Sequence, residues 1–499
     1  SPTNHFSSLN WRIINDINKT MKKIFCLGAL TLLSVSSFSQ KKVDFVEYDL
    51  PNGLHVILHQ EKSTPIVAVS ILYHVGSKNE KVGRTGFAHF FEHLLFEGSQ
   101  NIERGEYDKL VEGNGGTLNA NTSNDRTFYY EILPSNQLEL GLWLESERLL
   151  HAKVENIGIE TQRSVVKEEK RQRVDNQPYA SFITEAFKRM FVDHPYNWVP
   201  IGSMEDLDAA QEEDYVNFYK TFYVPSNATL SIAGDLDIEQ TKKWIDKYFA
   251  SIPSGQAINL VRDYENMTND EFVAAYGVEL SVLDGQEYNN PKSAEARKLL
   301  AKYAAMPTSI ARPPNYTGKL TKVIRDTVYD NIQLPALFIT YNFPNQTDKD
   351  FCALEMMNEI LSGGSSSRMN KSIVERKEMA VAAFSAPFGM EVGGIGILGA
   401  ISANGVDLTE LQKAIDDEIV KMQNELVTQE EFEKIRNKME SDLIDMNSRV
   451  AGIAENLADN HVYYGSAGRT NTMLEGYMKV TREDIQRVAK KYFTQDARL

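Results

Sequence analysis

The strongest constraint on this chain is an internal repeat, because its second half resembles a diverged copy of its first half. The segment EDIQRVAKKYFTQDARL at 483–499 repeats EDYVNFYKTFYVPSNATL at 213–230. The segment CALEMMNEILSGGSS at 352–366 aligns in the same way with FAHFFEHLLFEGSQ at 87–100. Such a repeat predicts two similar structural units rather than one large domain.

The local patterns within the first copy mix strands with helices. Alternating apolar residues on both sides of Pro51-Asn52-Gly53 predict a hairpin. Further strands are expected at 65–75, 118–122, 127–132 and 228–234, with helices at 138–149, 157–172 and 213–222. In the second copy, LPALFITYNFP at 334–344 has the pattern of the strand that begins at Pro65. This mixed order predicts an α+β fold rather than a doubly wound parallel sheet.

The repeat and the composition together predict four segments. Residues 1–40 are an upstream extension and a signal peptide, and 41–253 form the first repeat unit. Residues 254–319 are a polar linker with an inserted helical element, and 320–499 form the second unit. The second copy ends at Leu499, where the counterpart of strand 228–234 is expected to begin. Either that copy is truncated or its sheet has one strand fewer.

The start of the chain has the pattern of an export signal. Lys22 and Lys23 precede an apolar run, 24–33, and small residues lead to a cleavage site near Ser39-Gln40. The run is too short for a membrane span, so no span is expected in the mature chain, although an N-terminal anchor is the alternative. We therefore expect a periplasmic or secreted protein. Its mature form would contain Cys352 alone and no internal disulfide.

The overall charge restricts the partners. The 499 residues carry a formal net charge of −16, with 24% charged and 42% hydrophobic residues. Nothing in this composition offers a basic stripe for phosphate groups, which argues against nucleic-acid binding.

The motif HFFEH combines metal-binding and acid–base groups on one helix. A helix from about Gly86 to Phe96, capped by Thr85, would place His89 and His93 one turn apart on the same face. Two imidazoles at this spacing can bind one zinc ion, and Glu92 beside them can take a proton from water on the metal. The alternative is an apolar helix that happens to carry histidines. The second copy has that plain form, with Leu354, Met357 and Asn358 at the three positions.

Several motifs in order resemble one family. HFFEH is similar to the inverted zinc motif HxxEH of the inverzincins, and QRSVVKEEKRQRVDN at 162–176 is similar to the helix that follows it there. GGTLNANTSNDRTFYY, HPYNWVPIGS and YVPSNATLSIAGD also match family patterns. The chain thus resembles the pitrilysin and insulysin (M16) zinc metallopeptidases, and among them the short two-domain type of the mitochondrial processing peptidase subunits.

The resemblance implies roles for particular residues. It makes Glu169 the third ligand of one zinc ion per chain, with the adjacent Glu168 as a runner-up. It places the substrate backbone against Asn119 and Ala120. The family often has a glutamate that supports a ligand histidine where this chain has Gln162, which can hydrogen-bond to a histidine ligand but lacks the charge. The remaining histidines singled out, His55, His74, His151 and His194, are expected to be structural.

The resemblance also implies a fold, an activity and a partner. The fold would be two homologous α/β-roll domains, with antiparallel-rich sheets flanked by helices. The activity would be zinc-dependent endopeptidase cleavage of peptides or unfolded polypeptides, with Glu92 as general base. Family members use an Arg and a Tyr from a second half, but GGIGILGAISANG at 393–405 has neither. We therefore expect a dimer with another M16-type chain, either a homodimer or, favoured by that absence, a heterodimer. The alternatives are a non-catalytic structural or assembly subunit and a hydrolase of a non-peptide substrate.

Overall fold

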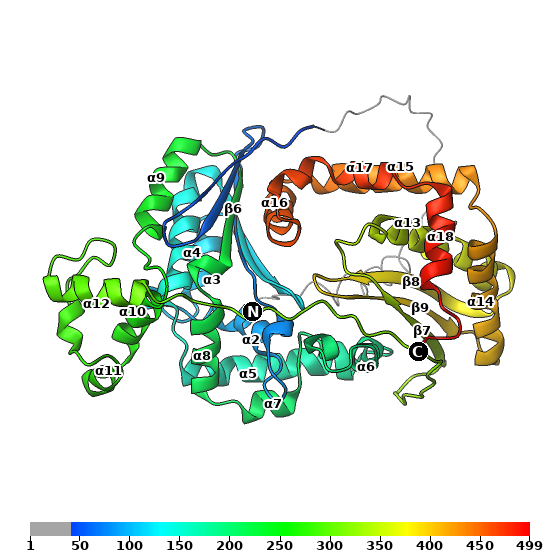
Figure 1. Ribbon diagram of the computed structural model, residues 1–499, viewed down its shortest axis with the longest axis horizontal. Helices are drawn as coiled ribbons and strands as arrows, with labels where there is room; N and C mark the ends of the chain where they lie inside the picture. Colours follow the sequence, from blue (N-terminus) through cyan, green and yellow to red (C-terminus); the bar gives the residue numbers. More distant parts are fainter. Residues whose placement is uncertain (1–40) are drawn as a thin grey trace.

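The structure is a computed structural model that describes residues 41–499, so the expected extension and signal peptide lie outside the described residues. Two halves lie side by side, each built on an open sheet with helices packed against it (Figure 1). The first sheet has the strand order β1-β2-β6-β3-β5-β4, and the second has the order β7-β9-β8. The expected α+β class with two homologous units is confirmed.

The elements of the first half follow the expected order. Its strands are β1 (Val46–Asp49), β2 (His55–Gln60), β3 (Ile66–Tyr73), β4 (Thr117–Thr122), β5 (Thr127–Pro134) and β6 (Ala228–Gly234). Its larger helices are α2 (Phe87–Leu94), α3 (Glu106–Gly113), α4 (Leu138–His151), α5 (Asn156–Lys170), α6 (Ser181–Met190), α7 (Met204–Ala209), α8 (Glu212–Phe222) and α9 (Ile238–Phe249). A π-helical turn, Arg171–Asp175, continues α5.

The second half repeats part of this series. Its strands are β7 (Ala336–Phe343), β8 (Ala380–Gly389) and β9 (Gly394–Ser402). Its helices are α13 (Phe351–Ser362), α14 (Leu408–Asn424), α15 (Gln429–Met446), α16 (Val450–Tyr464), α17 (Met473–Met478) and α18 (Arg482–Tyr492).

Strand pairing confirms the repeat. In the first half β5 lies between β3 and β4, and in the second half β9 lies between β7 and β8, with every one of these pairs antiparallel. At the chain end, Leu499 exchanges two backbone hydrogen bonds with Thr340 of β7, at 2.9 and 3.0 Å. Strand β6 pairs with the corresponding side of β3 in the first sheet.

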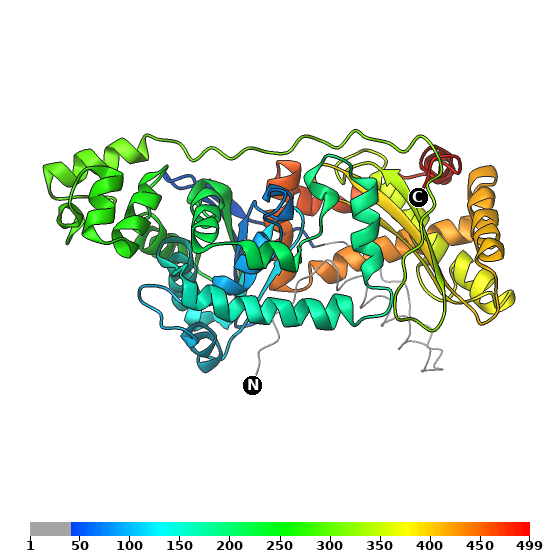
Figure 2. The same ribbon diagram turned by 90° about the horizontal axis from the view of Figure 1, so that it is seen from below.

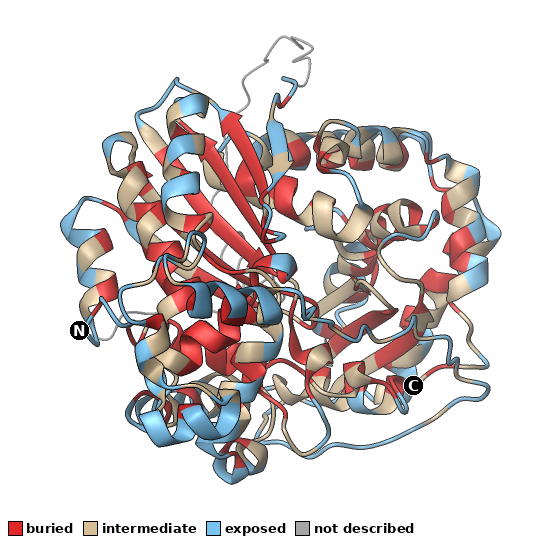
Figure 3. Ribbon diagram, turned by 60° about the vertical axis from the view of Figure 1, so that its left-hand side comes forward, coloured by how far each residue is buried: buried red, intermediate tan, exposed pale blue. Residues whose placement is uncertain are grey.

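Each half contributes one helix to the sheet of the other half. Helix α16 packs Ile453 and Leu457 against the first sheet, and α6 packs Phe187 against the second. Ring stacking between Phe182 of α6 and Phe338 of β7, with centroids 4.3 Å apart, is part of the second contact. The first sheet is therefore covered on both faces, and β3 and β6 are buried along nearly their whole length (Figure 3).

The segment expected as a linker with an insertion is largely helical at its start. Helices α10 (Ala257–Asn266), α11 (Asn269–Tyr276) and α12 (Ala294–Ala304) place apolar side chains in the core of the first half. The chain after α12 then crosses to β7 in the second half without a regular helix or strand (Figure 2). Within residues 41–499, no helix is both long enough and apolar enough to cross a bilayer.

Candidate metal centre

Helix α2 carries the HFFEH motif and begins at a sharply turned glycine. Gly86 precedes the helix with φ of +89°, a left-handed conformation that favours glycine. The carboxylate of Glu80 accepts hydrogen bonds from the backbone N–H groups of Gly86 and Ala88, at 2.9 and 2.8 Å. Glu80 thus satisfies N–H groups that would otherwise lack partners at the helix start.

The prediction that Thr85 caps this helix is wrong. Its hydroxyl donates to Asp206 at 2.6 Å and accepts from the backbone N–H of Ser203 at 3.1 Å, so it holds the start of α7 instead. The capping prediction failed because Gly86, rather than Thr85, adopts the N-cap position. The side chain that satisfies the helix N–H groups comes from an earlier loop.

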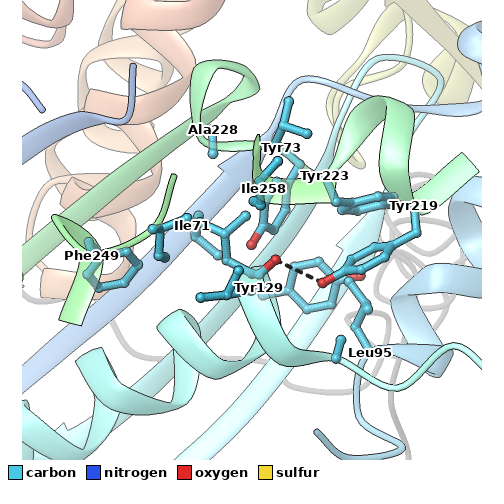
Figure 4. Packing of buried hydrophobic residues seen from close by; sticks show 14 of the residues in the cluster. Ile71, Tyr73, Leu95, Tyr129, Tyr219, Tyr223, Ala228, Phe249 and Ile258 are labelled. Atoms are coloured by element: carbon cyan, nitrogen blue, oxygen red, sulfur yellow. Dashed lines mark hydrogen bonds between the residues drawn. The ribbon is translucent and has the colours of Figure 1, made fainter. Parts of the chain in front are cut away.

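Several tyrosines lie close together in the core of the first half, among them Tyr73, Tyr129 and Tyr223 (Figure 4). Tyr73 lies against Tyr129 and Tyr223, with ring centroids 5.9 and 5.1 Å apart. The Tyr129 hydroxyl donates to the backbone carbonyl of Phe91 at 2.6 Å. These rings are fully buried and fix α2 against the first sheet.

Three side chains converge at the opposite face of α2. Nε2 of His93 lies 2.9 Å and Nε2 of His89 lies 3.4 Å from Oε2 of Glu169, which comes from the last turn of α5. The ligand-type atoms of the three residues all lie within 4.8 Å of one another. Ligand atoms on one tetrahedral zinc ion are about 3.3 Å apart, so this spacing fits a shared ion.

Glu169 is oriented by the helix that follows it. Nη1 of Arg173, four residues later, donates to Oε1 of Glu169 at 2.8 Å and leaves Oε2 directed at the histidines. The runner-up, Glu168, is bound instead to Arg171 and Gln172 on the solvent side. The structure therefore brings Glu169, and not Glu168, to the two histidines.

The charges in this cluster shift its pKa values strongly. Burial by itself would lower the pKa of His89, but the carboxylate of Glu169 outweighs burial and raises that pKa to about 9. Burial would raise the pKa of Glu169, but the two histidines hold it well below its usual range. Glu169 is thus an anion across the physiological pH range, as a metal ligand must be.

Glu92 lies beside the cluster and is completely buried. Its Oε2 accepts a hydrogen bond of 2.7 Å from the hydroxyl of Thr122, at the end of β4. Burial raises the pKa of Glu92, and the charges of His89 and His93 counteract this in part. A carboxylate with a raised pKa and one oxygen held in place is suited to general acid–base chemistry.

The centre contains buried polar atoms that the protein does not satisfy. Both ring nitrogens of His89, Nε2 of His93, Oε1 of Glu92 and Oε2 of Glu169 have no hydrogen bond of acceptable geometry. Buried groups of this kind are costly unless something binds them. Two imidazoles and one carboxylate with a further open position are the donors of a catalytic zinc site, so the residues present fit that ion.

The two expected substrate-binding residues lie at a sheet edge. Asn119 and Ala120 belong to β4, which pairs with β5 alone among the strands of residues 41–499. The Asn119 side chain accepts from the backbone N–H of Ala120 at 2.8 Å. The same strand ends at Thr122, so its edge runs directly past Glu92.

Gln162 has a different neighbour from the one expected. Its Nε2 donates to Oε1 of Glu97 at 2.7 Å, and Nε of Arg104 donates to the other oxygen of Glu97 at 2.7 Å. Glu97 follows α2, so this contact ties α5 to the end of the motif helix. Among the described residues, Gln162 makes no hydrogen bond to a ligand histidine, although its amide is able to form one.

The second copy of the site lacks this chemistry. Leu354, Met357 and Asn358 of α13 are buried, and the Asn358 amide donates to the Leu354 carbonyl at 2.8 Å. The 393–405 segment, which contains the whole of β9, has no arginine or tyrosine. Arg368, nearby in sequence, is held by Glu431 through two hydrogen bonds of 2.8 Å.

Two residues of the site had no role assigned from the sequence. Thr122 lies inside the GGTLNANTSNDRTFYY motif, and Arg173 lies four residues after Glu169 on the same helical path. A spacing of four residues between opposite charges on a helix predicts the contact between Arg173 and Glu169. Nothing local in the sequence pairs Thr122 with Glu92, because these residues meet only through the packing of β4 on α2.

Two family models match the chain. Insulinase (Peptidase family M16) matches residues 55–196, and Peptidase M16 inactive domain matches residues 210–439. The first match includes all of HFFEH and Glu169. The second includes the diverged copy on α13.

Known proteins of the same family resemble the chain along most of its length. "Zinc protease PqqE" of Helicobacter pylori is 27% identical over 478 residues, covering 95% of this chain and 96% of that protein. A probable mitochondrial-processing peptidase subunit beta of Arabidopsis thaliana is 24% identical over 453 residues, covering 89% and 75% respectively.

A solved structure agrees with these relatives. The crystal structure of a protease from Helicobacter pylori superimposes with a TM-score of 0.77 at 26% identity, covering 92% of this chain and 98% of that one. Both the family models and the relatives therefore point to one conclusion: this chain belongs to the M16 family of zinc peptidases.

Proposed function

We propose that this protein is a zinc-dependent endopeptidase that cleaves peptides or unfolded polypeptides. The observation that carries the proposal is the convergence of His89, His93 and Glu169 on one point, with Glu92 beside them. His89, His93 and Glu169 would hold one zinc ion in this centre. When bound, the ion supplies Lewis-acid chemistry, polarising a carbonyl and making a water molecule acidic.

The chain's own residues perform the remaining tasks. Glu92 takes a proton from the attacking water at Oε1 and later gives it to the leaving amine. Thr122 holds Oε2, so the proton transfers occur at one oxygen. The substrate pairs with the free edge of β4 at Asn119 and Ala120 as an added strand. Backbone hydrogen bonds then supply affinity, and the sequence requirements stay loose.

The proposal extends to assembly and location. The second half provides no arginine or tyrosine at 393–405, which supports a dimer in which another M16-type chain completes the substrate site. The measured mass of the protein in size-exclusion chromatography tests the dimer. The signal-type residues 22–40 support export to the periplasm or beyond, and the N-terminal sequence of the exported protein tests that.

The activity is tested by the variant Glu92→Gln. We expect the zinc-loaded wild type to cleave an unfolded reporter peptide, to lose activity with a chelator and to regain it with zinc. Glu92→Gln leaves the three ligands intact, so it should keep its zinc and lose about 10²–10⁴-fold in kcat. Glu112→Gln, on an exposed helix position, is the control and should cleave normally.

One result would contradict the peptidase assignment. If the zinc-loaded wild type cleaves no peptide, alone or with a co-purified second M16 chain, the structural-subunit alternative replaces it. Cleavage that persists in Glu92→Gln would remove the assigned role of Glu92.

A further inference from the structure

A second cluster of ligand-type residues lies where the two halves meet. Glu47 belongs to β1 and His55 begins β2, so both come from the first hairpin of the first half. His461 comes from α16, the helix that the second half contributes to the first sheet. The cluster is separate from the centre on α2, and the proposed peptidase reaction does not use it.

The donor atoms of this cluster are close enough to share one ion. One nitrogen or oxygen from each of Glu47, His55 and His461 lies within 4.8 Å of the other two. Oε2 of Glu47 is 3.1 Å from Nε2 of His55, near the spacing of about 3.3 Å for two ligands of one tetrahedral zinc ion. The rings of His55 and His461 are stacked, with centroids 3.6 Å apart and planes 7° apart, so one ring must rotate about its side-chain bonds for both to place a nitrogen on the same ion.

A fourth residue orients the first histidine. Oδ1 of Asp49 lies 2.7 Å from Nδ1 of His55. A carboxylate on one ring nitrogen fixes the tautomer and directs the other nitrogen towards a metal, as is common for metal-binding histidines. The nitrogen left for binding is Nε2, which is the one that faces Glu47.

Nε2 of His55 and Oε2 of Glu47 form an ion pair in the structure, and a metal ion bound by both residues would replace that contact. The His55 side chain is 13% exposed and that of Glu47 is 41% exposed, so an ion can enter from solvent. Glu47 and Asp49 place two carboxylates beside two imidazoles. Imidazole with carboxylate is a donor set for zinc and its neighbours, not for calcium or magnesium, which prefer oxygen alone.

We propose that Glu47, His55 and His461 form a second metal site that binds one divalent zinc-type ion, with Asp49 orienting His55. Because the ligands come from both halves, the ion ties α16 to the β1–β2 hairpin. This proposal gives His55 a ligand role, where the sequence led us to expect a structural one. The ion would strengthen the contact between the two halves. This role is separate from the proposed peptidase function.

The site is tested by zinc stoichiometry on the full chain. Metal-free protein titrated with zinc, followed by calorimetry and by metal analysis after dialysis, should bind two ions per chain. His461→Gln should bind one ion, at the centre on α2. Glu169→Gln should weaken zinc binding at the centre on α2 and leave the second site unchanged. Asp49→Asn should weaken the second ion by about 10–100-fold, the usual effect of removing an orienting carboxylate.

Two further variants guard against misfolding and unspecific binding. Glu47→Gln changes an exposed side chain, so a folding defect is not expected, and it should weaken the second ion by at least about tenfold. His151→Gln is the matched control, because His151 pairs with Glu265 at 2.6 Å outside either ligand group, and it should still bind two ions. A second readout is the unfolding midpoint of the wild type and of His461→Gln, each measured with one and with two equivalents of zinc. Only the wild type should gain stability from the second equivalent of zinc.

The outcomes separate this inference from the peptidase proposal. A wild type that binds one ion, or a His461→Gln variant that still binds two, overturns the second site. In either case peptide cleavage and its loss in Glu92→Gln are unaffected. Loss of one ion in His461→Gln with cleavage retained supports the second site.

Discussion

At the scale of single residues, Glu169 shows how one carboxylate can serve two neighbours. Its Oε1 is held by Arg173, and its Oε2 lies between the two histidines. Glu168 carries the same charge one position earlier on the helix. Successive residues point in different directions around a helix axis, so the Glu168 side chain faces solvent. The side chain's position on the helix, and not its type, decides which glutamate can bind the metal.

The pair of glutamates gives a direct test. Glu169→Gln removes an anionic ligand, so zinc affinity at the α2 centre should fall by at least about tenfold, measured by competition with a chelator. Glu168→Gln should bind zinc as the wild type does, because its carboxylate contacts only Arg171 and Gln172. Equal zinc affinities for the two variants would remove Glu169 from the site.

At the scale of elements, the start of α2 depends on two glycines that touch. A Cβ on Gly202 would lie 2.5 Å from Cα and N of Gly86, and Gly202 itself has φ of +69°. Gly202 belongs to the HPYNWVPIGS motif. The motif therefore has a steric reason: it lets the loop before α7 pass the first turn of α2.

Gly202→Ala tests this contact. The added methyl group must push α2 and the loop apart, so we expect a loss of about 3 kcal/mol or more in unfolding free energy, as in other sites of strain or overpacking. Gly83→Ala is the matched control, because Gly83 has φ of +82° with no atom within 4 Å of its would-be Cβ. It should lose only about 1–2 kcal/mol, the cost of the left-handed conformation. If urea unfolding gives similar losses of unfolding free energy for Gly202→Ala and Gly83→Ala, the steric role of Gly202 is disproved.

At the scale of the whole molecule, the tips of two hairpins meet between the halves. Asp125 follows β4 and Glu391 follows β8, and Oδ2 of Asp125 accepts from the backbone N–H of Glu391 at 3.1 Å. The buried ammonium of Lys78 contacts both carboxylates, and His74 lies 2.8 Å from Glu391. These contacts join corresponding turns of the two copies through one buried cation.

Glu391→Gln probes this junction and its pH dependence. Burial alone would raise the pKa of Glu391, but His74 and Lys78 lower it from 4.5 to about 2. Its anion therefore stabilises the fold above about pH 4.5, and this contribution is lost as the pH falls towards 2. The variant should lose about 1–3 kcal/mol at pH 7, and its difference from the wild type should shrink by pH 3.5.

Urea unfolding at pH 7, 5 and 3.5 provides the measurement. Glu433→Gln, an exposed position hydrogen-bonded only within α15, is the control and should match the wild type at each pH. A difference for Glu391→Gln that grows with acidity would contradict the assigned ion pairs.

Local sequence patterns predict the features that depend on neighbours along the chain. Apolar alternation located β4, β5 and β6 to within two residues, and the repeat anticipated the matching sheets. The spacing of His89, Glu92 and His93 placed three groups on one helix, because helical geometry follows from local hydrogen bonds. Glu169 could be named only through the resemblance to a family, since no local rule links α5 to α2.

Contacts between residues far apart in the chain depend instead on how the elements pack together. Thr85 has a capping side chain, yet Glu80 takes that role because the loop before α2 folds back. Gln162 meets Glu97, and α6 and α16 each cover the other half's sheet. None of these contacts follows from local patterns, because burial of apolar faces is non-directional and many pairings satisfy it. Packing of all the elements together selects one of these pairings. The selected pairing also sets the positions of the charged groups between the halves.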